Sequence, residues 1–337
     1  KMLSIYGFPF MLAMFVSYVL TPYIKKLAFK IGAVDRPDNR KVHKKIMPRL
    51  GGLAIYIAFM IGCVASMEIT WDIFGILLGG TLIVALGVAD DVYQLPAKVK
   101  LLGQIAAACV LVIFDIRIEW VNNPLGGYFY LDMLSIPFTI FWVISFTNVV
   151  NLIDGLDGLA AGVSAIASLT VILVSVQMGY FHVAVLTAAL AGAIIGFIRY
   201  NFNPATIFMG DTGSMFIGYM LAAISVYGAV KTAATIALIV PAIALGLPIL
   251  DTAFAIMRRY VNGRPIFQPD KGHLHHRLLA TGMSHKETVL FMYGITAVLC
   301  IGAVLWAEMD GFYAALIIAV IMTAVAVGAK KIGILND

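Results

Sequence analysis

Charged side chains are scarce in this chain. Asp, Glu, Lys and Arg make up 12% of the 337 residues, whereas a soluble globular protein carries about 25%. Hydrophobic residues reach 61%, and the mean hydropathy is +0.96. This composition excludes an ordinary soluble fold. The apolar residues form long continuous runs rather than short alternating segments, which excludes an outer-membrane barrel and predicts an all-α polytopic membrane protein.

Cysteine is also rare. The three cysteines, Cys63, Cys109 and Cys300, all lie inside apolar runs and have neither metal-binding nor redox spacing. A disulfide framework and a cysteine-based metal centre are therefore excluded. No early small-residue cleavage site follows the first apolar run, so we expect that run to be a retained helix rather than a signal peptide.

The apolar runs predict about eleven transmembrane helices in a single domain that comprises residues 1–337. Several runs are shorter than the roughly 20 residues that a perpendicular span needs, so their borders are approximate. An odd number of spans places the two termini on opposite sides of the membrane. The predicted spans are 3–22, 52–67, 72–89, 100–114, 133–148, 161–178, 183–199, 213–229, 233–256, 288–306 and 312–328.

The basic residues predict the orientation. With alternate loops on opposite sides, roughly 20 of the 23 Lys and Arg fall on one side, and Lys1, Arg117 and Lys231 fall on the other. The positive-inside rule makes the richer side cytoplasmic, with the N-terminus outside and the C-terminus inside. The net charge of +5 thus reflects topology, and no nucleic-acid partner is expected. The cytoplasmic loops expected to form the active site are about 24–51, 90–99, 149–160, 200–212 and 257–287.

Aspartates gather at the cytoplasmic ends of the predicted spans, whereas the outer acidic residues are scattered among aromatic residues and glycines. Polar groups at the edge of the lipid are costly, which makes the inner set a functional candidate. The pattern predicts a cytoplasmic-facing site for an anionic, metal-bound ligand. The inner aspartates are Asp90, Asp91, Asp154, Asp157, Asp211 and Asp251.

Two amides and two carboxylates follow one another in the stretch 148–158. Asn148, Asn151 and Asp154 share one helix face, and Asp157 continues that stripe unless Gly155 ends the helix. Such oxygen ligands suit Mg²⁺, which prefers a few carboxylates, retained waters and substrate phosphate. The alternative is a helix C-cap in which these side chains satisfy free backbone groups.

Asp90 and Asp91 are adjacent at a helix end, and Lys98 and Lys100 follow where the next span begins. Adjacent carboxylates repel unless a cation lies between them. The pair is therefore expected to bind metal, to supply a nucleophile, or to form salt bridges with the two lysines.

The third acidic position is Asp211, which Gly210 and Gly213 bracket immediately before another span. Glycines there suit a tight turn that exposes backbone N–H groups to phosphate, and Phe208 could stack on a base. We expect Asp211 to be a metal ligand rather than a helix cap. Its Asp-Thr-Gly-Ser sequence also occurs in aspartic proteases, but those enzymes use the motif twice in a soluble β fold.

Basic residues at two other cytoplasmic loops are candidates for phosphate binding. In the first loop, Lys44, Lys45 and Arg49 could hold phosphate or lipid headgroups. The last large loop contains His273, His275, His276 and Arg277, which fit phosphate oxygens better than zinc because no Cys and no HExxH motif accompany them. For other residues we expect structural or surface roles: Asp251 pairing with Arg258, and His182 and His285 at the surface.

Together, Asp90-Asp91, 148–158, 208–214 and 273–277, in this order, resemble the polyprenyl-phosphate N-acetylhexosamine-1-phosphate transferase family, glycosyltransferase family 4. The bacterial branch that makes undecaprenyl-diphospho-GlcNAc is most similar, since the His-Leu-His-His-Arg sequence resembles that branch more than the three consecutive histidines of phospho-MurNAc-pentapeptide transferases. The resemblance extends over roughly residues 30–290.

The resemblance implies transfer of GlcNAc-1-phosphate from UDP-GlcNAc to undecaprenyl phosphate, with release of UMP. It also implies Mg²⁺, for which Mn²⁺ can substitute, and a homodimer in the bacterial cytoplasmic membrane. The implied metal ligands are Asn151, Asp154 and Asp211, with Asp90 and Asp91 catalytic alongside Asp154 and Asp211. The uridine would contact Asp157, Asn201 and Phe208. The diphosphate and sugar would contact His273, His275, His276 and Arg277. The lipid phosphate would contact Lys100 and Lys45.

Two other classes are weighed against the transferase. A transporter of an anionic solute would show internal repeats and charges near mid-span, and neither is evident. An intramembrane aspartyl protease would need Asp211 and Asp251 to face each other within the bilayer, yet both lie near the cytoplasmic surface. The sequence does not distinguish UDP-GlcNAc from another UDP-HexNAc, nor direct attack from an aspartyl-phosphate route.

Overall fold

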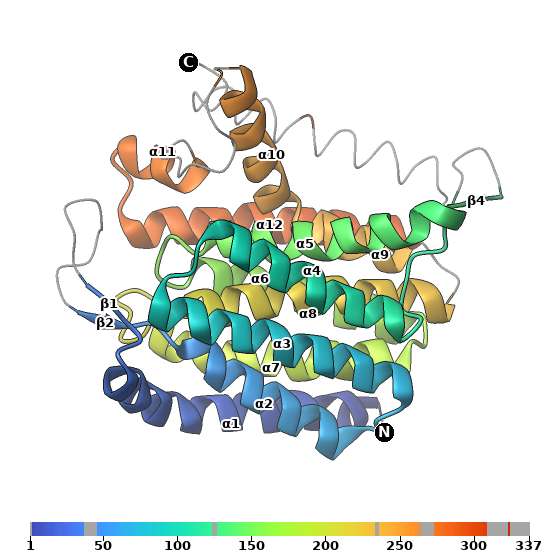
Figure 1. The fold of residues 1–337 in the computed structure, drawn as a ribbon, viewed down its shortest axis with the longest axis horizontal. Helices are drawn as coiled ribbons and strands as arrows, with labels where there is room; N and C mark the ends of the chain where they lie inside the picture. The colour runs from blue at the N-terminus through green and yellow to red at the C-terminus, as the bar shows by residue number, and fades with distance from the viewer. Residues whose placement is uncertain are drawn as a thin grey trace.

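The computed structural model describes residues 2–36, 46–122, 127–232, 236–261, 263, 273–308 and 323. In these residues the chain forms a bundle of α-helices with two short hairpins (Figure 1), which confirms the all-α prediction. The helices are α1 (Met2–Ile31), α2 (Gly51–Ser66), α3 (Trp71–Tyr93), α4 (Ala97–Ile113), α5 (Ser135–Ile153), α6 (Leu159–Gln177), α7 (Phe181–Asn201), α8 (Gly210–Thr232), α9 (Ile236–Ala244), α10 (Gly246–Val261), α11 (Leu274–Ala280) and α12 (His285–Glu308), with one 3-10 turn at Asp132–Leu134.

The two hairpins lie at opposite ends of the bundle (Figure 1). At one end, β1 (Val34–Asp35) pairs antiparallel with β2 (Met47–Pro48). At the other end, β3 (Trp120–Asn122) pairs antiparallel with β4 (Tyr128–Tyr130). The hairpin β1–β2 and helix α11 share one end, and that end also holds the candidate site described below.

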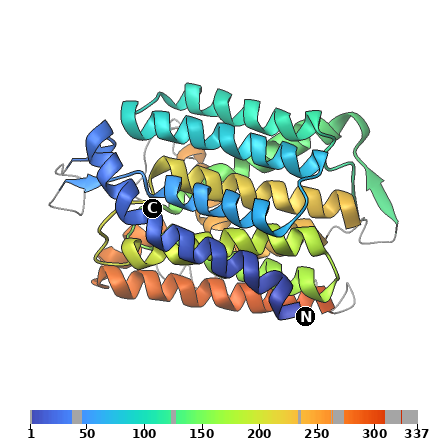
Figure 2. The same cartoon turned by 90° about the horizontal axis from the view of Figure 1, so that it is seen from below.

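Helix α8 lies at the centre of the bundle and packs against α2, α3, α5 and α9. Its neighbours approach closely because they present glycine: a side chain at Gly52 of α2 would collide with the backbone of Gly213, and one at Gly87 of α3 with that of Thr212. Backbone contact of this kind through small residues is typical of membrane helix packing. In Figure 2, α8 is seen enclosed among the other helices. The packing fixes the first turn of α8, which carries Asp211.

Among the described residues, seven helices are long and apolar enough to cross a membrane: α1, α3, α5, α6, α7, α8 and α12. Helices α2 and α4 are shorter, with 16 and 17 residues. The chain is thus a polytopic membrane protein. The predicted span 312–328 lies outside the described residues apart from Thr323, so the total of eleven stays a prediction.

In the described residues, the span predicted at 233–256 is not one straight helix. The chain breaks between α9 and α10, whose axes are bent by 73°. Pro248, the third residue of α10, has no backbone N–H to bond to the preceding turn, and Gly246 tolerates the irregular backbone at the junction. Helix α10 therefore leaves the bundle, as Figure 1 shows.

Several predicted loop borders also shift by a few residues. Asp90 and Asp91 lie in the last turn of α3, Asn151 in the last turn of α5, and Asn201 ends α7. Lys100 lies in the first turn of α4. These side chains are therefore held on helix ends, which fixes their directions more tightly than a loop would.

Candidate active site

A cavity of about 460 Å³ lies at the end of the bundle that carries β1–β2 and α11. Its walls come from six separate parts of the chain, from the first hairpin to the start of α12. Carboxylates and basic groups both line it, as an anionic ligand with a cation would require. The lining residues are Asp35, Arg49, Asp154, Gly155, Leu156, Asp157, Asn201, Asn203, Phe208, Gly210, Asp211, His276 and His285.

Asp91 caps the first turn of α8. Its carboxylate accepts the N–H of Asp211 at 2.9 Å, the N–H of Thr212 at 3.0 Å and the Thr212 hydroxyl at 2.6 Å. Free N–H groups at a helix N-terminus bind a carboxylate well. Gly210 is required beside this contact, because its φ is 73° and a side chain there would meet the Asp91 carboxylate. The Asp91 side chain is 0% exposed, so it is fully used within the protein.

Arg49 completes the shell around Asp91. Its Nε and Nη2 lie 3.0 and 2.9 Å from Asp91 Oδ1, and Nη2 lies 3.7 Å from Asp211 Oδ1. Burial opposes the charge of Arg49, but the two carboxylates outweigh it and raise its pKa. The loop that carries Arg49 is itself pinned, since Phe208 donates its N–H to Pro48 and accepts that of Gly51.

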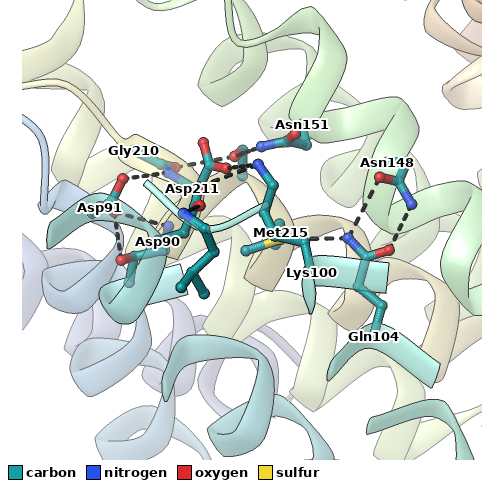
Figure 3. Close-up of polar contacts among 12 residues, drawn as sticks. Asp90, Asp91, Lys100, Gln104, Asn148, Asn151, Gly210, Asp211 and Met215 are labelled. Atoms are coloured by element: carbon teal, nitrogen blue, oxygen red, sulfur yellow. Dashed lines mark hydrogen bonds and ion pairs between the residues drawn. The ribbon is translucent and has the colours of Figure 1, made fainter. Parts of the chain in front are cut away.

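Lys100 bridges the other two aspartates of this cluster (Figure 3). Its ammonium lies 3.2 Å from Asp90 Oδ2 and 2.9 Å from Asp211 Oδ2. Asp90 also accepts the N–H of Leu95 at 2.7 Å, so its carboxylate has partners on both oxygens. Asp211 thus has Lys100 at one oxygen and Arg49 at the other, while its own side chain stays 20% exposed.

An amide pair lies one helical turn further along α4. Asn148 donates to Gln104 Oε1 at 2.7 Å, and Gln104 donates back to Asn148 Oδ1 at 3.4 Å and to the sulfur of Met215 at 3.5 Å. Figure 3 shows this pair beside Lys100. The pair ties α4 to α5, so the Asn148 amide is engaged in contacts within the protein.

Asn151 and Asp154 lie at the end of α5, and Asp154 lines the cavity. The Asn151 amide donates to Ser214 Oγ at 2.9 Å, which leaves its oxygen as an acceptor. No described residue donates a hydrogen bond or ion pair to the Asp154 carboxyl. Burial, followed by the charges of Asp211 and Asp91, raises the pKa of Asp154 to about 8. The charge of Arg49 opposes this shift but does not reverse it.

These groups match the donor chemistry of a hard divalent cation: two carboxylates and an amide oxygen. In the described residues, no group of three His, Cys, Asp or Glu side chains converges on one point at metal-ligand distances. In the structure the ammonium of Lys100 and the guanidinium of Arg49 occupy the space beside Asp211 that a metal would share.

Asp157 and Asn201 organise the loop between α7 and α8. Asp157 accepts the side-chain N–H of Asn203 at 3.1 Å and the main-chain N–H of Ala205 at 3.0 Å. Asn201 accepts the N–H of Gly158 and donates to Ile207, both at 3.1 Å. With Phe208 they line the cavity, so all three residues expected at the uridine lie together.

The four residues in segment 273–277 that were expected to hold the diphosphate and sugar are not equivalent. His276 lines the cavity, whereas His273 and His275 are buried. Burial and the neighbouring His276 lower the pKa of His275 to about 3, so this ring is neutral. Arg277 lies in the last turn of α11. Lys45, expected at the lipid phosphate, lies outside the described residues.

Two expectations about single residues are wrong. His285 is not an isolated surface residue, because its Nε2 accepts the N–H of Asp157 at 3.0 Å and its side chain lines the cavity. Asp251 contacts His273 Nδ1 at 3.0 Å and the N–H of Leu274 at 2.9 Å, in place of the expected Arg258 partner. Sequence reasoning missed both, since their partners are 128 and about 20 residues away. Asp35 and Asn203 were also missed, and no motif marks them.

Comparisons with known proteins agree on one family. Residues 73–229 match the model described as glycosyl transferase family 4. The probable undecaprenyl-phosphate N-acetylglucosaminyl 1-phosphate transferase of Bacillus subtilis is 41% identical over 330 residues, which cover 97% of this chain and 92% of that protein. The decaprenyl-phosphate N-acetylglucosaminephosphotransferase of Mycolicibacterium smegmatis is 38% identical, over 86% of this chain and 79% of that protein.

A more distant relative is the phospho-N-acetylmuramoyl-pentapeptide-transferase of a Thermoanaerobacter species, which is 31% identical over 86% of this chain and 93% of that protein. Sequence identity at this level, over nearly the whole length of the chain, is sufficient to assign the family. The chain belongs to glycosyl transferase family 4, the family that its aspartate, asparagine and histidine motifs resemble.

Proposed function

We propose that this protein transfers GlcNAc-1-phosphate from UDP-GlcNAc to undecaprenyl phosphate, giving undecaprenyl-diphospho-GlcNAc and UMP. The observation that carries the proposal is the cavity in which carboxylates from α5 and α8 meet Arg49 and His276 at one end of a membrane bundle. The relative at 41% identity, named for this transfer, supports the same substrates. The product would begin a cell-envelope glycan such as teichoic acid or O-antigen.

In this proposal the nucleotide sugar binds in the cavity of about 460 Å³. Phe208 stacks on the uracil, and the loop that Asp157 and Asn201 hold together forms the uridine wall. Both side chains already have partners within the protein, so they act mainly by shaping that wall. His276 and Arg277 face the diphosphate and sugar from α11 as hydrogen-bond donors.

The residues fit Mg²⁺, which would be held by Asn151, Asp154 and Asp211, with Mn²⁺ as a substitute. The ion would neutralise the pyrophosphate and the leaving UMP. Asp154 supports the assignment because burial and the charges of Asp211 and Asp91 disfavour its ionised carboxylate, which a divalent cation would stabilise. For Asp154 to act as a ligand, its proton must leave, so binding would release a proton to solvent.

We assign the acceptor phosphate to the Lys100 side of Asp211. A phosphate monoester is mostly a dianion at neutral pH, because its second pKa is about 6, so it attacks with little help from a base. Its oxygen bonds to the β-phosphorus of UDP-GlcNAc, the bond from that phosphorus to the bridging oxygen breaks, and UMP leaves with the electron pair. Lys100 holds the incoming phosphate after releasing Asp211, and Lys45 is proposed as a second contact.

The proposal gives Asp90 and Asp91 positioning roles. Both are buried, and their oxygens are already taken by Lys100 and Leu95 in one case and by Arg49 and the α8 amides in the other. A nucleophile would have to leave these partners before it could reach substrate. We therefore favour direct attack by the lipid phosphate over an aspartyl-phosphate intermediate.

The remaining assignments follow from family and charge. We propose one transmembrane domain of eleven helices in the bacterial cytoplasmic membrane, with the N-terminus outside and the C-terminus inside. The five loops 24–51, 90–99, 149–160, 200–212 and 257–287 would build the active site on the cytoplasmic face. A homodimer is proposed by family analogy alone.

The test is UMP release by purified protein in detergent, with UDP-GlcNAc and undecaprenyl phosphate, each omitted in turn and with or without Mg²⁺. Release that needs donor, lipid and metal together supports the proposal, and a panel of UDP-sugars then assigns the donor. The absence of UMP release from folded protein with any UDP-HexNAc would move the transporter alternative to the front.

A further inference from the structure

A buried carboxylate–imidazole pair lies beside the cavity without lining it. Asp251 of α10 places Oδ2 3.0 Å from His273 Nδ1, and its Oδ1 accepts the N–H of Leu274 at 2.9 Å. The two side chains are only 4% and 8% exposed. One carboxylate thus fixes both the first turn of α11 and the ring that immediately precedes it.

Helix α11 needs this support from outside. It has seven residues, from Leu274 to Ala280, and a helix this short does not stay formed by itself. Its N-cap residue His273 makes no side-chain cap, so Asp251 takes that place from another helix. The buried Leu274 and Leu278 hold α11 among its neighbours, α12 above all.

The placement of α11 determines one wall of the cavity. His273 and His275 lie with their rings parallel at 5.9 Å, and His275 lies 4.3 Å from His276, which lines the cavity. The His275 ring covers Gly155, where an added Cβ would be 2.7 Å from Nε2. A shift of the His273 ring would therefore displace the His275 ring and, through its contact with Gly155, the turn at residues 154–157.

The carboxylate also selects one form of the His273 ring. Because a carboxylate oxygen of Asp251 accepts, Nδ1 of His273 is the nitrogen that donates in this contact. A carboxylate oriented in this way fixes tautomer and ring direction together. An amide in its place would present N–H to Nδ1 and reverse that choice.

We propose that Asp251 is a positioning residue that acts through His273 to set α11 against the sugar-diphosphate part of the nucleotide sugar. The inference rests on the proposed function, because it takes the nucleotide sugar as the ligand of the cavity. Asp251 does not line the cavity. Its effect should therefore appear in binding of the part of the ligand that α11 faces, and should be absent from the uridine monophosphate part.

The experiment measures the dissociation constants of UDP-GlcNAc and of UMP for the full chain in detergent, by isothermal titration, with Asp251→Asn as the variant. Asparagine keeps an acceptor for the Leu274 N–H and loses the acceptor for His273 Nδ1. We expect UDP-GlcNAc to bind about tenfold more weakly and UMP to change by less than about twofold. Glu287→Gln is the matched control, since Glu287 accepts the N–H of Ser284 at the start of α12 and has no histidine partner.

A double-mutant cycle with His273→Asn separates positioning from simple folding support. If Asp251 acts through His273, Asp251→Asn adds less than about twofold to the loss in the His273→Asn background. Unchanged UDP-GlcNAc binding in Asp251→Asn, equal losses for both nucleotides, or additive losses in the cycle would each overturn the inference while wild-type binding upholds the proposed function. Wild-type protein that binds neither nucleotide would overturn the proposed function and this inference with it.

Discussion

Lys100 and Asp211 are 111 residues apart in the sequence, yet the ammonium of one lies 2.9 Å from a carboxylate oxygen of the other. Their contact joins α4 to α8 at the end of the bundle where the cavity opens. Asp90 shares the same ammonium at 3.2 Å. One cation therefore neutralises two carboxylates that would otherwise repel each other.

Replacing the Lys100 ammonium with a neutral amide should abolish most of the transferase activity. In Lys100→Gln, Asp90 and Asp211 lose their shared partner, and we expect kcat/KM for the lipid acceptor to fall by about 100-fold or more. Lys98→Gln is the matched control, because Lys98 is exposed two residues earlier on the same helix. It should keep activity within about twofold, as measured by UMP release at varied lipid. Equal losses in the two variants would contradict the role of Lys100.

Asp91 should matter for stability more than its position at a helix end suggests. Asp91→Ala leaves Arg49 and two N–H groups of α8 without their acceptor, and breaking a buried pair of this kind costs about 3–5 kcal/mol. Asp72→Asn, at the other end of α3, breaks the partly exposed pair with Lys231, keeps an acceptor for the Thr70 hydroxyl, and should cost about 1 kcal/mol or less. Thermal unfolding in detergent would rank the two variants, and a larger loss in Asp72→Asn would refute the capping role.

The sequence predicted which residues lie at this site better than it predicted which partners each of them contacts. The cluster Asp90, Asp91, Asn151 and Asp211 could be found because carboxylates and amides at membrane helix ends are costly and therefore conspicuous. Whether each would touch a ligand or another protein group was not readable, since that depends on how α3, α4 and α8 are packed. The burial of Asp91 under α8 is a tertiary relationship of this kind.

The same limit explains the errors in the second half of the chain. The run 233–256 is apolar throughout, so hydropathy alone indicates one span, and the bend of 73° depends on local backbone geometry near Pro248. His285 begins a helix in a pattern typical of a surface residue. Its contact with Asp157 arises only because α12 packs against α6, which follows that turn.

Folding stability should depend on pH through His275. Its pKa falls from 6.5 to about 3 in the folded protein, so below pH 6.5 the unfolded state binds a proton that the folded state does not. Stability from this ring is present above pH 6.5 and is lost as the pH falls toward 3. His275→Asn should therefore flatten the decline of the melting temperature between pH 7 and pH 5. His182→Asn, at the far end of α7, should retain the wild-type slope, and identical slopes in all three proteins would count against the buried neutral ring.

The contact of His275 with Gly155 gives a further prediction. A Cβ at position 155 would lie 2.7 Å from Nε2 of the buried His275 ring. Gly155→Ala should therefore destabilise the protein by about 1–3 kcal/mol and weaken UDP-GlcNAc binding. Gly294→Ala is the control, because no atom of the described residues lies within 4 Å of a Cβ built there. Equal melting temperatures for the two variants would show that α11 does not pack on this turn.

The central claim is that a phosphate group moves together with the sugar, and following the β-phosphate tests it most directly. Purified protein is incubated with UDP-GlcNAc labelled with ³²P at the β-phosphate, together with undecaprenyl phosphate and Mg²⁺, and the organic and aqueous phases are then separated. The account predicts label in the lipid phase and unlabelled UMP in the aqueous phase, with neither formed in Asp211→Ala. Label that remains in aqueous UDP while the sugar enters the lipid phase would contradict it.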